Sequence, residues 1–532
     1  MPKKINNNLP LILIILDGWG MDKLNKGNAI ALAKTPVLDS LFKKYLFTKL
    51  RAHGRYVGLP VKQVGNSEAG HMNIGAGRLV EQDVVKINSS IKDGTFFKNS
   101  AFLGAIRHAR KMNSKIHIMG MLSNGQSPHS DPKHFIALLN LLKKNKIENV
   151  NLHLFTDGRD SPQHVSLQLV DDLEKHFFNN EKIATIMGRF YAMDRKKKWE
   201  RTEKAYDALV LNKGRFAENA QDAVIQSYNR GDSDEFIEPC VIGNDNGKSS
   251  RISDGDSVIF FNLRSDRSRQ LAKVFVQNNF KKMNKGAFSR KKQLKHLYFV
   301  AMTDFGPDLD DILTAYPGID LCGTLPMVLS DLRQLYIAET EKYAHVTYFL
   351  NGGYSGKVCA EDQCMIQSPD VKSYDQTPAM SSEKLTKKVI DNLCLRNSGK
   401  ASWKYDFTLL NFAAPDMVGH TGNIKAGIKC CEIIDRCVSD IVEAYLNVNG
   451  TIIITADHGN IEKMLNLKTG EIHTEHTTNP VPFVIVNKNM KNTKCPLGKK
   501  LKTNGVLGDI APTILKIINK KIPKEMTGGS LF

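Results

Sequence analysis

Three apolar runs of the sequence lead into residues whose side chains bind metals. A single Asp-Gly or Asp-His pair is ordinarily a turn, but the same chemistry after three strand-like runs favours a metal site. Mixed carboxylate and imidazole ligands suit Mn²⁺ or Zn²⁺ better than Ca²⁺, which prefers oxygen alone. The residues are Asp17 after the run 11–16, Asp416 and His420 after the run 407–412, and Asp457 and His458 after the run 451–455.

The segment Gly65–His71 offers a nucleophile to such a site. Ser67 lies between two glycines at the start of a predicted helix, whose first N–H groups can receive an anion. The plainer interpretation is a helix N-cap, with Glu68 in the first turn. A metal close to the hydroxyl would lower its pKa and make Ser67 a nucleophile toward phosphorus.

One more imidazole near the C-terminus is a candidate member of the metal group. The segment 473–480 contains both His473 and His476, which lie close together in the sequence. Spacing alone does not choose between the two rings, so this segment is a weaker indication of a ligand than the three strand ends.

A second group, made of arginines, follows three strand-like runs in the middle of the chain. Arginine binds phosphate and carboxylate through a planar fork, so several arginines at strand ends indicate a small substrate that carries both anions. The alternative is a set of surface ion pairs with the neighbouring Asp160, Asp194 and Asp266. Recurrence after three runs favours a binding site. The group consists of Arg159, Arg189, Arg195, Arg264 and Arg267.

The elements that must position both groups alternate between short apolar runs and helical patterns. This alternation predicts an α/β protein with mainly parallel strands, in which ligands bind beyond the carboxyl ends of the strands. Because the metal-like residues lie near the two ends of the chain and the arginines in its middle, we expect one domain inserted into another. The expected strands are 11–16, 116–119, 152–155, 183–187, 257–261, 298–302, 407–412, 451–455 and 484–486.

Composition excludes several classes of protein. The chain has 532 residues, of which 41% are hydrophobic and 24% charged, so a globular protein of two or more domains is expected. The net charge is +19, but no RNA-binding aromatic signature, zinc-finger spacing or basic heptad accompanies it, and we expect no nucleic-acid partner. The nine cysteines follow no framework spacing, which indicates reduced thiols in a cytoplasmic protein.

The apolar run 11–16 also bears on localisation. It is far too short to span a bilayer, which takes about 20 apolar residues. It ends in Asp17-Gly18 and has no small-residue cleavage site, unlike a secretory signal. We therefore expect a buried strand and no membrane partner.

Together the motifs resemble those of the cofactor-independent phosphoglycerate mutases, in order and over nearly the whole chain. The resemblance implies an alkaline-phosphatase-like metal domain with an inserted α/β transferase domain that binds glycerate. We place the metal domain at residues 1–81 and 313–532 and the insert at 82–312. The stretches that carry the resemblance are 17–20, 65–71, 157–160, 189–195, 339–343, 415–420, 455–460, 476–482, 509–513 and 525–528.

The resemblance also implies site residues and cofactors. Two divalent ions are expected, Mn²⁺ first, with Mg²⁺, Co²⁺ or Zn²⁺ as alternatives. The implied ligands are Asp416, His420 and His476 for one ion, and Asp17, Ser67, Asp457 and His458 for the other. The implied substrate residues are His129, Arg159, Asp160, Arg189, Arg195, Arg264 and Arg267, with Lys342 and Glu341 from the metal domain.

The implied reaction interconverts 3-phosphoglycerate and 2-phosphoglycerate without 2,3-bisphosphoglycerate. Ser67 takes the phosphoryl group, bound glycerate turns, and the group returns to the other oxygen. Lys342 and the metals hold the transferring charge, Asp160 is the base for the glycerate hydroxyls, and Arg264 belongs to the clamp that retains the carboxylate. We expect a monomeric, cytoplasmic enzyme whose partner is the small molecule phosphoglycerate.

The chain departs from the family pattern at two places, and three alternatives stay open. It has one extra residue around His129, in the stretch 125–131, and Lys62-Gln63-Val64 replaces a commoner Gly-Gln-Met. A metal-dependent phosphatase would pass the phosphoryl group to water, but the five arginines favour retention of an anionic acceptor. A phosphopentomutase-like enzyme would not be expected to match the arginine motifs, and the full ligand set argues against an inactive basic scaffold.

Overall fold

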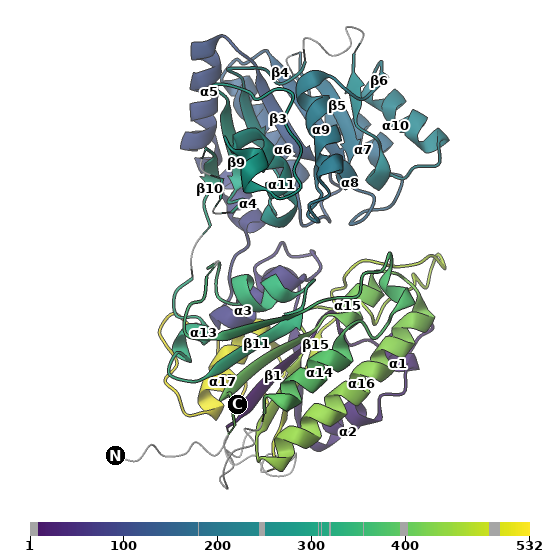
Figure 1. Ribbon diagram of the computed structural model, residues 1–532, viewed down its shortest axis with the longest axis vertical. Coiled ribbons are helices and arrows are strands. Elements are labelled where there is room, and N and C mark those ends of the chain that lie inside the picture. Colours follow the sequence, from purple (N-terminus) through teal and green to yellow (C-terminus); the bar gives the residue numbers. More distant parts are fainter. Residues whose placement is uncertain are drawn as a thin grey trace. The chain divides into compact units, whose positions relative to one another are not determined.

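The computed structural model describes residues 9–532 except 179, 244–249, 307, 310, 319–320, 355, 394–402 and 489–500. The chain divides into two compact units, Met1–Gln82 with Ile319–Phe532 and Asp83–Gly318, each of them α/β (Figure 1). The second division lies after the strand β10 (Leu313–Tyr316), which pairs with β9 of the second unit, whereas the boundary predicted from the sequence lies before this strand.

The first unit is built on an eight-stranded sheet in the order β12-β11-β13-β1-β14-β15-β2-β16. Strand β1 runs parallel to both of its neighbours, β13 and β14, and all six of its residues are buried, as in a sheet covered on both faces. Strand β15 is antiparallel to β14 and β2. The strands are β1 (Leu11–Leu16), β2 (Leu46–Arg51), β11 (Gln334–Glu339), β12 (Asp362–Ile366), β13 (Phe407–Phe412), β14 (Thr451–Thr455), β15 (Val481–Val486) and β16 (Gly505–Val506).

Helices cover this sheet on both faces. Helices α1, α2, α14 and α16 pack on one side, and α3, α13 and α17 on the other (Figure 1). None of the helices in the described residues combines the length and the apolar run that a membrane crossing needs. The helices are α1 (Ala29–Leu32), α2 (Pro36–Lys44), α3 (Ser67–Ala76), α13 (Leu325–Val328), α14 (Ser382–Asp391), α15 (Ala414–Gly419), α16 (Ile424–Asn447) and α17 (Ile510–Ile517).

The second unit has its own eight-stranded sheet, in the order β10-β9-β8-β3-β4-β5-β7-β6. Strands β10 to β5 of this order run parallel, and β7 is antiparallel to β5. The strands are β3 (Ile116–Met121), β4 (Val150–Thr156), β5 (Lys182–Gly188), β6 (Arg215–Ala217), β7 (Cys240–Ile242), β8 (Ser257–Phe260), β9 (Tyr298–Thr303) and β10 (Leu313–Tyr316).

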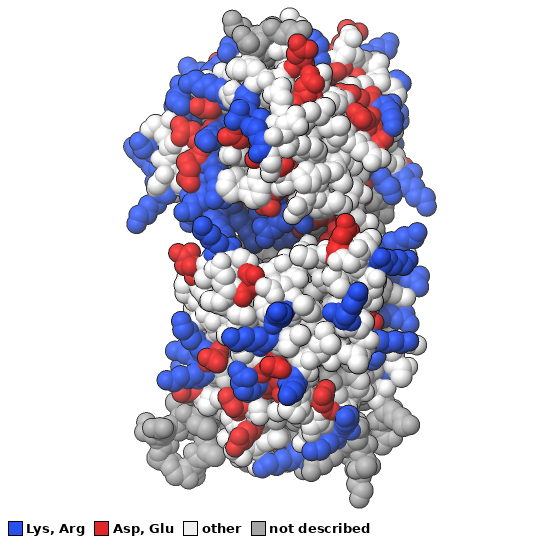
Figure 2. Space-filling view, turned by 90° about the vertical axis from the view of Figure 1, so that its right-hand side faces the viewer, with Lys and Arg blue, Asp and Glu red and all other residues white. Residues whose placement is uncertain are grey.

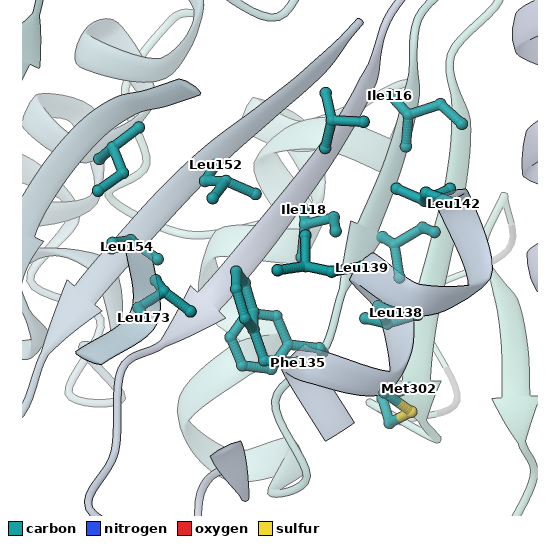
Figure 3. Packing of buried hydrophobic residues seen from close by; sticks show 14 of the residues in the cluster. Ile116, Ile118, Phe135, Leu138, Leu139, Leu142, Leu152, Leu154, Leu173 and Met302 are labelled. Atoms are coloured by element: carbon teal, nitrogen blue, oxygen red, sulfur yellow. The ribbon is translucent and has the colours of Figure 1, made fainter. Parts of the chain in front are cut away.

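Two apolar cores lie on the two faces of this sheet. Ile116 and Ile118 of β3 point into one core, where they pack with α6 residues such as Leu138 and Leu142, and the alternate residues Met119 and Met121 point into the other (Figure 3). The helices are α4 (Asp83–Asp93), α5 (Ser100–Met112), α6 (Pro132–Lys144), α7 (Ser166–Glu174), α8 (Arg189–Ala192), α9 (Trp199–Leu211), α10 (Ala220–Asn229), α11 (Ser265–Val276) and α12 (Phe280–Met283).

All nine runs expected to be strands form strands, and β1, β13 and β14 have the expected bounds. The α/β fold class with mainly parallel strands is confirmed. The strands absent from the expectation are mostly short or lie toward the sheet edges, where apolar runs are weakest. Among them, β2 alternates between buried and less buried residues, and β12 is an edge strand that is largely accessible.

A chain of hydrogen bonds crosses the second sheet inside its core. The Nε2 of His117 lies 3.1 Å from Asp256 Oδ2, and its Nδ1 lies 2.9 Å from His153 Nε2. The Nδ1 of His153 lies 3.0 Å from the Thr185 hydroxyl. All four side chains are buried. The chain is complete when each ring carries one proton, and a second proton on both rings would set two N–H groups face to face.

We predict that the protein loses stability as the pH falls below 6.5. Burial lowers the pKa of both His117 and His153 from the ordinary 6.5, so the folded protein keeps these rings neutral while the unfolded chain takes up protons. The contribution of the neutral rings to stability is therefore fully present above pH 6.5. At pH 5.5 the free energy of unfolding should be lower by about 1 kcal/mol for each ring. Urea unfolding at pH 7.5 and 5.5 measures this loss. The non-titrating variant His153→Gln should reduce it, and an unchanged pH dependence would contradict the account.

Candidate metal centre and anion site

Three aspartates singled out from the sequence lie together at the carboxyl edge of the first sheet. Asp17 follows β1, Asp457 follows β14, and Asp416 lies in the first turn of α15, directly after β13. Because these three strands are adjacent and parallel, their ends bring the carboxylates to one place. All three side chains are buried.

Ser67 joins this group from the first turn of α3. Asn66 caps the helix, since its side chain accepts the Ala69 N–H at 2.9 Å, so the capping role that the sequence left open for Ser67 belongs to its neighbour. The Ser67 hydroxyl instead faces the acidic group. Its Oγ lies 3.2 Å from Asp17 Oδ1 and 2.9 Å from His458 Nε2.

Lys342 brings a positive charge among the carboxylates. It follows β11 and is 4% exposed. Its Nζ donates to Asp17 Oδ1 at 2.5 Å, to Asp416 Oδ2 at 2.6 Å and to Ser67 Oγ at 2.7 Å. The adjacent Glu341 accepts a hydrogen bond from the Tyr374 hydroxyl at 2.8 Å.

Two glycines permit these close approaches. Gly18 has a φ of +71°, and a Cβ there would lie 2.8 Å from Asp416 Cα. Gly70 on α3 faces the end of β14, where an added Cβ would lie 2.7 Å from Asp457 Cβ. The residues beside the two carboxylates must therefore lack side chains.

Two imidazoles converge on Asp416. The Nδ1 of His420 lies 2.7 Å from the carbonyl oxygen of Thr474, and the Nδ1 of His476 lies 2.8 Å from that of Gly65. Because a carbonyl only accepts, each neutral ring carries its proton on Nδ1 and presents a lone pair on Nε2. The two Nε2 atoms are 3.1 Å apart, and each is 3.3 Å from Asp416 Oδ1. His476, not the nearby histidine three residues earlier, thus joins the group.

This donor set fits divalent cations. Asp457 Oδ1 accepts the backbone N–H groups of Gly18 and His458, whereas the nearest side-chain nitrogen to its buried Oδ2 is His71 Nδ1, at 3.3 Å. A buried carboxylate oxygen with such a long contact and two facing imidazole lone pairs are features that a bound cation would satisfy. The groups whose ligand atoms lie within 4.8 Å of one another are Asp416-His420-His476, Asp17-Asp416-His458 and Asp17-His71-Asp457.

The charges of the centre are strongly coupled. Burial alone would raise the pKa of Asp416, but Lys342 and His420 hold it well below its usual range. Burial opposes the charged form of His458, yet Asp457, Asp17 and Asp416 raise its pKa to about 9. The centre therefore concentrates negative charge that attracts cations.

Several polar residues around the centre were not identified from the sequence as site residues. Buried Glu462 accepts the N–H groups of Gly20 and Asn460, and so ties the loop after β14 to the segment after β1. Asn411 contacts Asp17, and His71 contacts Asp457. The sequence pattern that could have identified Asn411 is a polar residue inside an apolar strand. No such pattern marks Glu462.

The second unit gathers its own charged residues at the carboxyl ends of β3, β4, β5 and β8. Arg189, the first residue of α8, is buried and donates to Asp157 Oδ1 at 2.5 Å and to Asp160 Oδ2 at 2.6 Å. Its Nη2 lies 3.0 Å from Nε2 of His129, which comes from the loop after β3. The structure thus brings together three residues predicted from the sequence, His129, Asp160 and Arg189.

Two further arginines share one aspartate. The Nη1 of Arg195 lies 2.7 Å from Asp266 Oδ2, and the Nε of Arg264 lies 3.4 Å from Asp266 Oδ1. The first of these ion pairs joins the segment after β5 to the segment after β8. Asp194, the sequence neighbour of Arg195, contacts Arg201 at 3.2 Å and accepts from Gln270 at 2.9 Å.

The remaining two arginines of the group lie among like charges. Burial and the charges of Arg195, Arg189 and Arg159 lower the pKa of Arg267, which lies in the first turn of α11. Arg159 is half-exposed, and its Nη1 lies 3.9 Å from Glu235. Figure 2 shows a dense group of Lys and Arg side chains on the surface of this unit, in the upper half of the view. A bound anion would relieve this repulsion.

Comparisons with known proteins cover the whole chain. Residues 9–522 match the Metalloenzyme superfamily. A 2,3-bisphosphoglycerate-independent phosphoglycerate mutase of Clostridium kluyveri is 47% identical over 98% of this chain and 99% of its own length. One from Methanosarcina barkeri is 46% identical over 98% of each chain. The crystal structure of Leishmania mexicana phosphoglycerate mutase at low cobalt concentration has a TM-score of 0.86 and 28% identity, and covers 100% of this chain and 99% of that one.

We predict that His420→Ala removes one bound divalent ion per chain, because it deletes one of the two lone pairs that converge on Asp416. Equilibrium dialysis against Mn²⁺ with elemental analysis gives the stoichiometry. Arg264→Ala, in the other unit, is the control and should keep the wild-type metal content. Loss of metal from the arginine variant, or full content in the histidine variant, would contradict this division of roles.

Proposed function

The chain belongs to the 2,3-bisphosphoglycerate-independent phosphoglycerate mutases of the Metalloenzyme superfamily, and we propose how its own residues carry out the reaction. It is an isomerase that interconverts 3-phosphoglycerate and 2-phosphoglycerate in glycolysis and gluconeogenesis. The observation that carries the mechanism is the Ser67 hydroxyl, which lies at a helix start within hydrogen-bond distance of Lys342, His458 and Asp17.

Ser67 is the phosphoryl acceptor in this proposal. Its Oγ forms a bond to phosphorus while the bond from phosphorus to O3 of the glycerate breaks, and the serine proton ends on O3, which gives phosphoserine and bound glycerate. In the return step the bond from phosphorus to O2 forms, the Ser67 ester breaks, and the proton of the O2 hydroxyl ends on Ser67. Lys342 donates to Ser67 Oγ, so its charge stabilises the alkoxide and then the oxygens in transit.

Two divalent ions, most readily Mn²⁺, are part of the proposal, with Mg²⁺, Co²⁺ and Zn²⁺ as alternatives. Bound metal would lower the pKa of the serine hydroxyl and neutralise phosphoryl oxygens. The mixed oxygen and imidazole donors favour a transition metal. The residues proposed to hold the ions are Asp416, His420 and His476 for one, and Asp17, Ser67, Asp457 and His458 for the other.

The second unit is proposed to retain the glycerate while it turns. Burial would raise the pKa of Asp160, but Arg189 and His129 hold it well below its usual range, so the carboxylate stays ionised and accepts the glycerate hydroxyls. The arginines bind the substrate carboxylate. The residues proposed for the substrate are His129, Arg159, Asp160, Arg189, Arg195, Arg264 and Arg267, with Lys342 at the phosphoryl group.

The same retention argues for a mutase over a phosphatase. A phosphatase needs only water as acceptor, and an arginine cluster that holds the leaving acid would delay its release. We propose a monomeric cytoplasmic enzyme whose partner is phosphoglycerate. The apolar run near the N-terminus is the buried strand β1.

We predict that Ser67→Ala lowers mutase turnover by roughly 10⁴-fold or more, because it removes the phosphoryl acceptor. Circular dichroism should show an intact fold, since Ser67 Oγ contacts the site and not the apolar core. Rapid quenching of the wild-type enzyme with substrate should yield a peptide phosphorylated on Ser67. Near-normal activity in the alanine variant would end the assignment.

The fate of the phosphoryl group gives a second test. With 3-phosphoglycerate in ¹⁸O-water, 2-phosphoglycerate should form without ¹⁸O in its phosphate, because retained glycerate keeps water from the phosphoserine. Arg264→Ala should raise the share of free phosphate by several-fold, since glycerate would leave before it accepts the group. Phosphate as the main product of the wild-type enzyme would favour the phosphatase alternative.

A further inference from the structure

A second layer of polar side chains lies beneath Ser67, Asp17 and Asp457. It consists of His71, one turn along α3 from Ser67, and Asn411, on the central strand β13, and both are fully buried. Buried polar side chains inside an apolar strand and a packed helix are costly unless they make hydrogen bonds. These two residues do so with the metal centre.

Asn411 has a fixed orientation. Its Nδ2 donates to Asp17 Oδ2 at 2.7 Å, and the carboxylate accepts only, so the amide nitrogen and not the oxygen must face it. The same nitrogen lies 3.0 Å from Nε2 of His71. An amide nitrogen only donates, and Nε2 of His71 is therefore an acceptor.

The tautomer of His71 follows from this contact. Its proton must be on Nδ1, which lies 2.9 Å from the carbonyl oxygen of Ser67 and 3.3 Å from Asp457 Oδ2. The donating edge of the ring thus faces the backbone of the nucleophile and the carboxylate oxygen that accepts no other hydrogen bond. Because Asn411 binds Oδ2 of Asp17, the other oxygen, Oδ1, faces Ser67 Oγ at a distance of 3.2 Å.

We propose that His71 and Asn411 are positioning residues that fix Asp17, Asp457 and Ser67 in the arrangement needed for one divalent ion. The proposal rests on the function assigned above to those three residues. His71 is not itself a ligand, although it lies within ligand distance of Asp17 and Asp457, because Nε2 accepts from Asn411 and Nδ1 carries the proton. Partners of this kind change metal affinity by roughly 10- to 100-fold when they are removed.

Two substitutions at one position separate positioning from ligation. The side-chain amide nitrogen of His71→Asn can take the place of Nδ1 and keep its donor, whereas that of His71→Gln reaches toward the place of Nε2 and loses it. Mn²⁺ titration of the full-length protein, followed by electron paramagnetic resonance of the free ion, measures the affinity. We expect about 10- to 100-fold weaker binding at one of the two sites in His71→Gln and no more than about a threefold change in His71→Asn.

Each alternative outcome overturns the proposal. Equal loss in both variants would make His71 a ligand, and wild-type affinity in both would make it part of the packing alone. Asn411→Leu, which keeps the approximate shape and removes both donations, should weaken the same site, and full affinity there would also contradict the proposal. The matched controls are His134→Asn and His134→Gln, at a buried histidine of α6 in the other unit, which should bind as the wild type does. Thermal unfolding identifies any variant that fails to fold.

Asp457→Asn distinguishes this inference from the proposed function. If Asp457→Asn loses one ion while His71→Gln keeps wild-type affinity, the ligand assignment stands and the positioning role is wrong. If Asp457→Asn keeps both ions, the ligand assignment itself fails. Both results are read from metal binding and need no measurement of turnover.

Discussion

The first unit depends on the compensation of three buried carboxylates. Asp17, Asp416 and Asp457 are at most 2% exposed, and like charges so close together in a low-dielectric interior repel strongly. Lys342 and His458 supply part of the opposing charge, and backbone N–H groups satisfy one oxygen of Asp457. The two facing imidazole lone pairs of His420 and His476 and the negative charge that remains would be satisfied by bound cations. The same concentration of buried charge therefore favours the binding of metal ions.

The second unit has the opposite arrangement. Its site arginines lie near one another, and part of their charge is taken up by acids of the described residues, for example by Asp157 and Asp160 around Arg189. Arg267 lies among like charges that lower its pKa. A site of this kind suits a small dianion, because the ion replaces repulsion between side chains with bidentate hydrogen bonds. In the proposed mechanism the two units thus divide the task between group transfer and retention of the acid.

Much of this organisation could be predicted from the sequence because chemistry follows strands. The runs at β1, β13 and β14 are apolar throughout, so the polar residues directly after them stood out. Asn411 and His71 did not stand out in this way, because Asn411 lies within a strand and His71 lies on a helix. Their contact forms only when β13 and α3 come together in the fold. Which of two histidines joins Asp416 was likewise decided by a backbone carbonyl, that of Gly65, far away in the sequence.

The order of the chain explains why the metal group and the sheet are inseparable. Strand β1 has no sequence-local partner, because both of its neighbours, β13 and β14, come from the C-terminal part of the chain. Asp17 can therefore meet Asp416 and Asp457 only after these long-range strand pairings form. Their formation is slow, because a long loop must close first. The insert lies between α3 and α13 in the sequence, so it interrupts none of these three strands. Gly18 then sets the final distance: with its positive φ and no Cβ, it lets the end of β1 rest against Asp416, so the backbone itself determines how closely the two carboxylates approach.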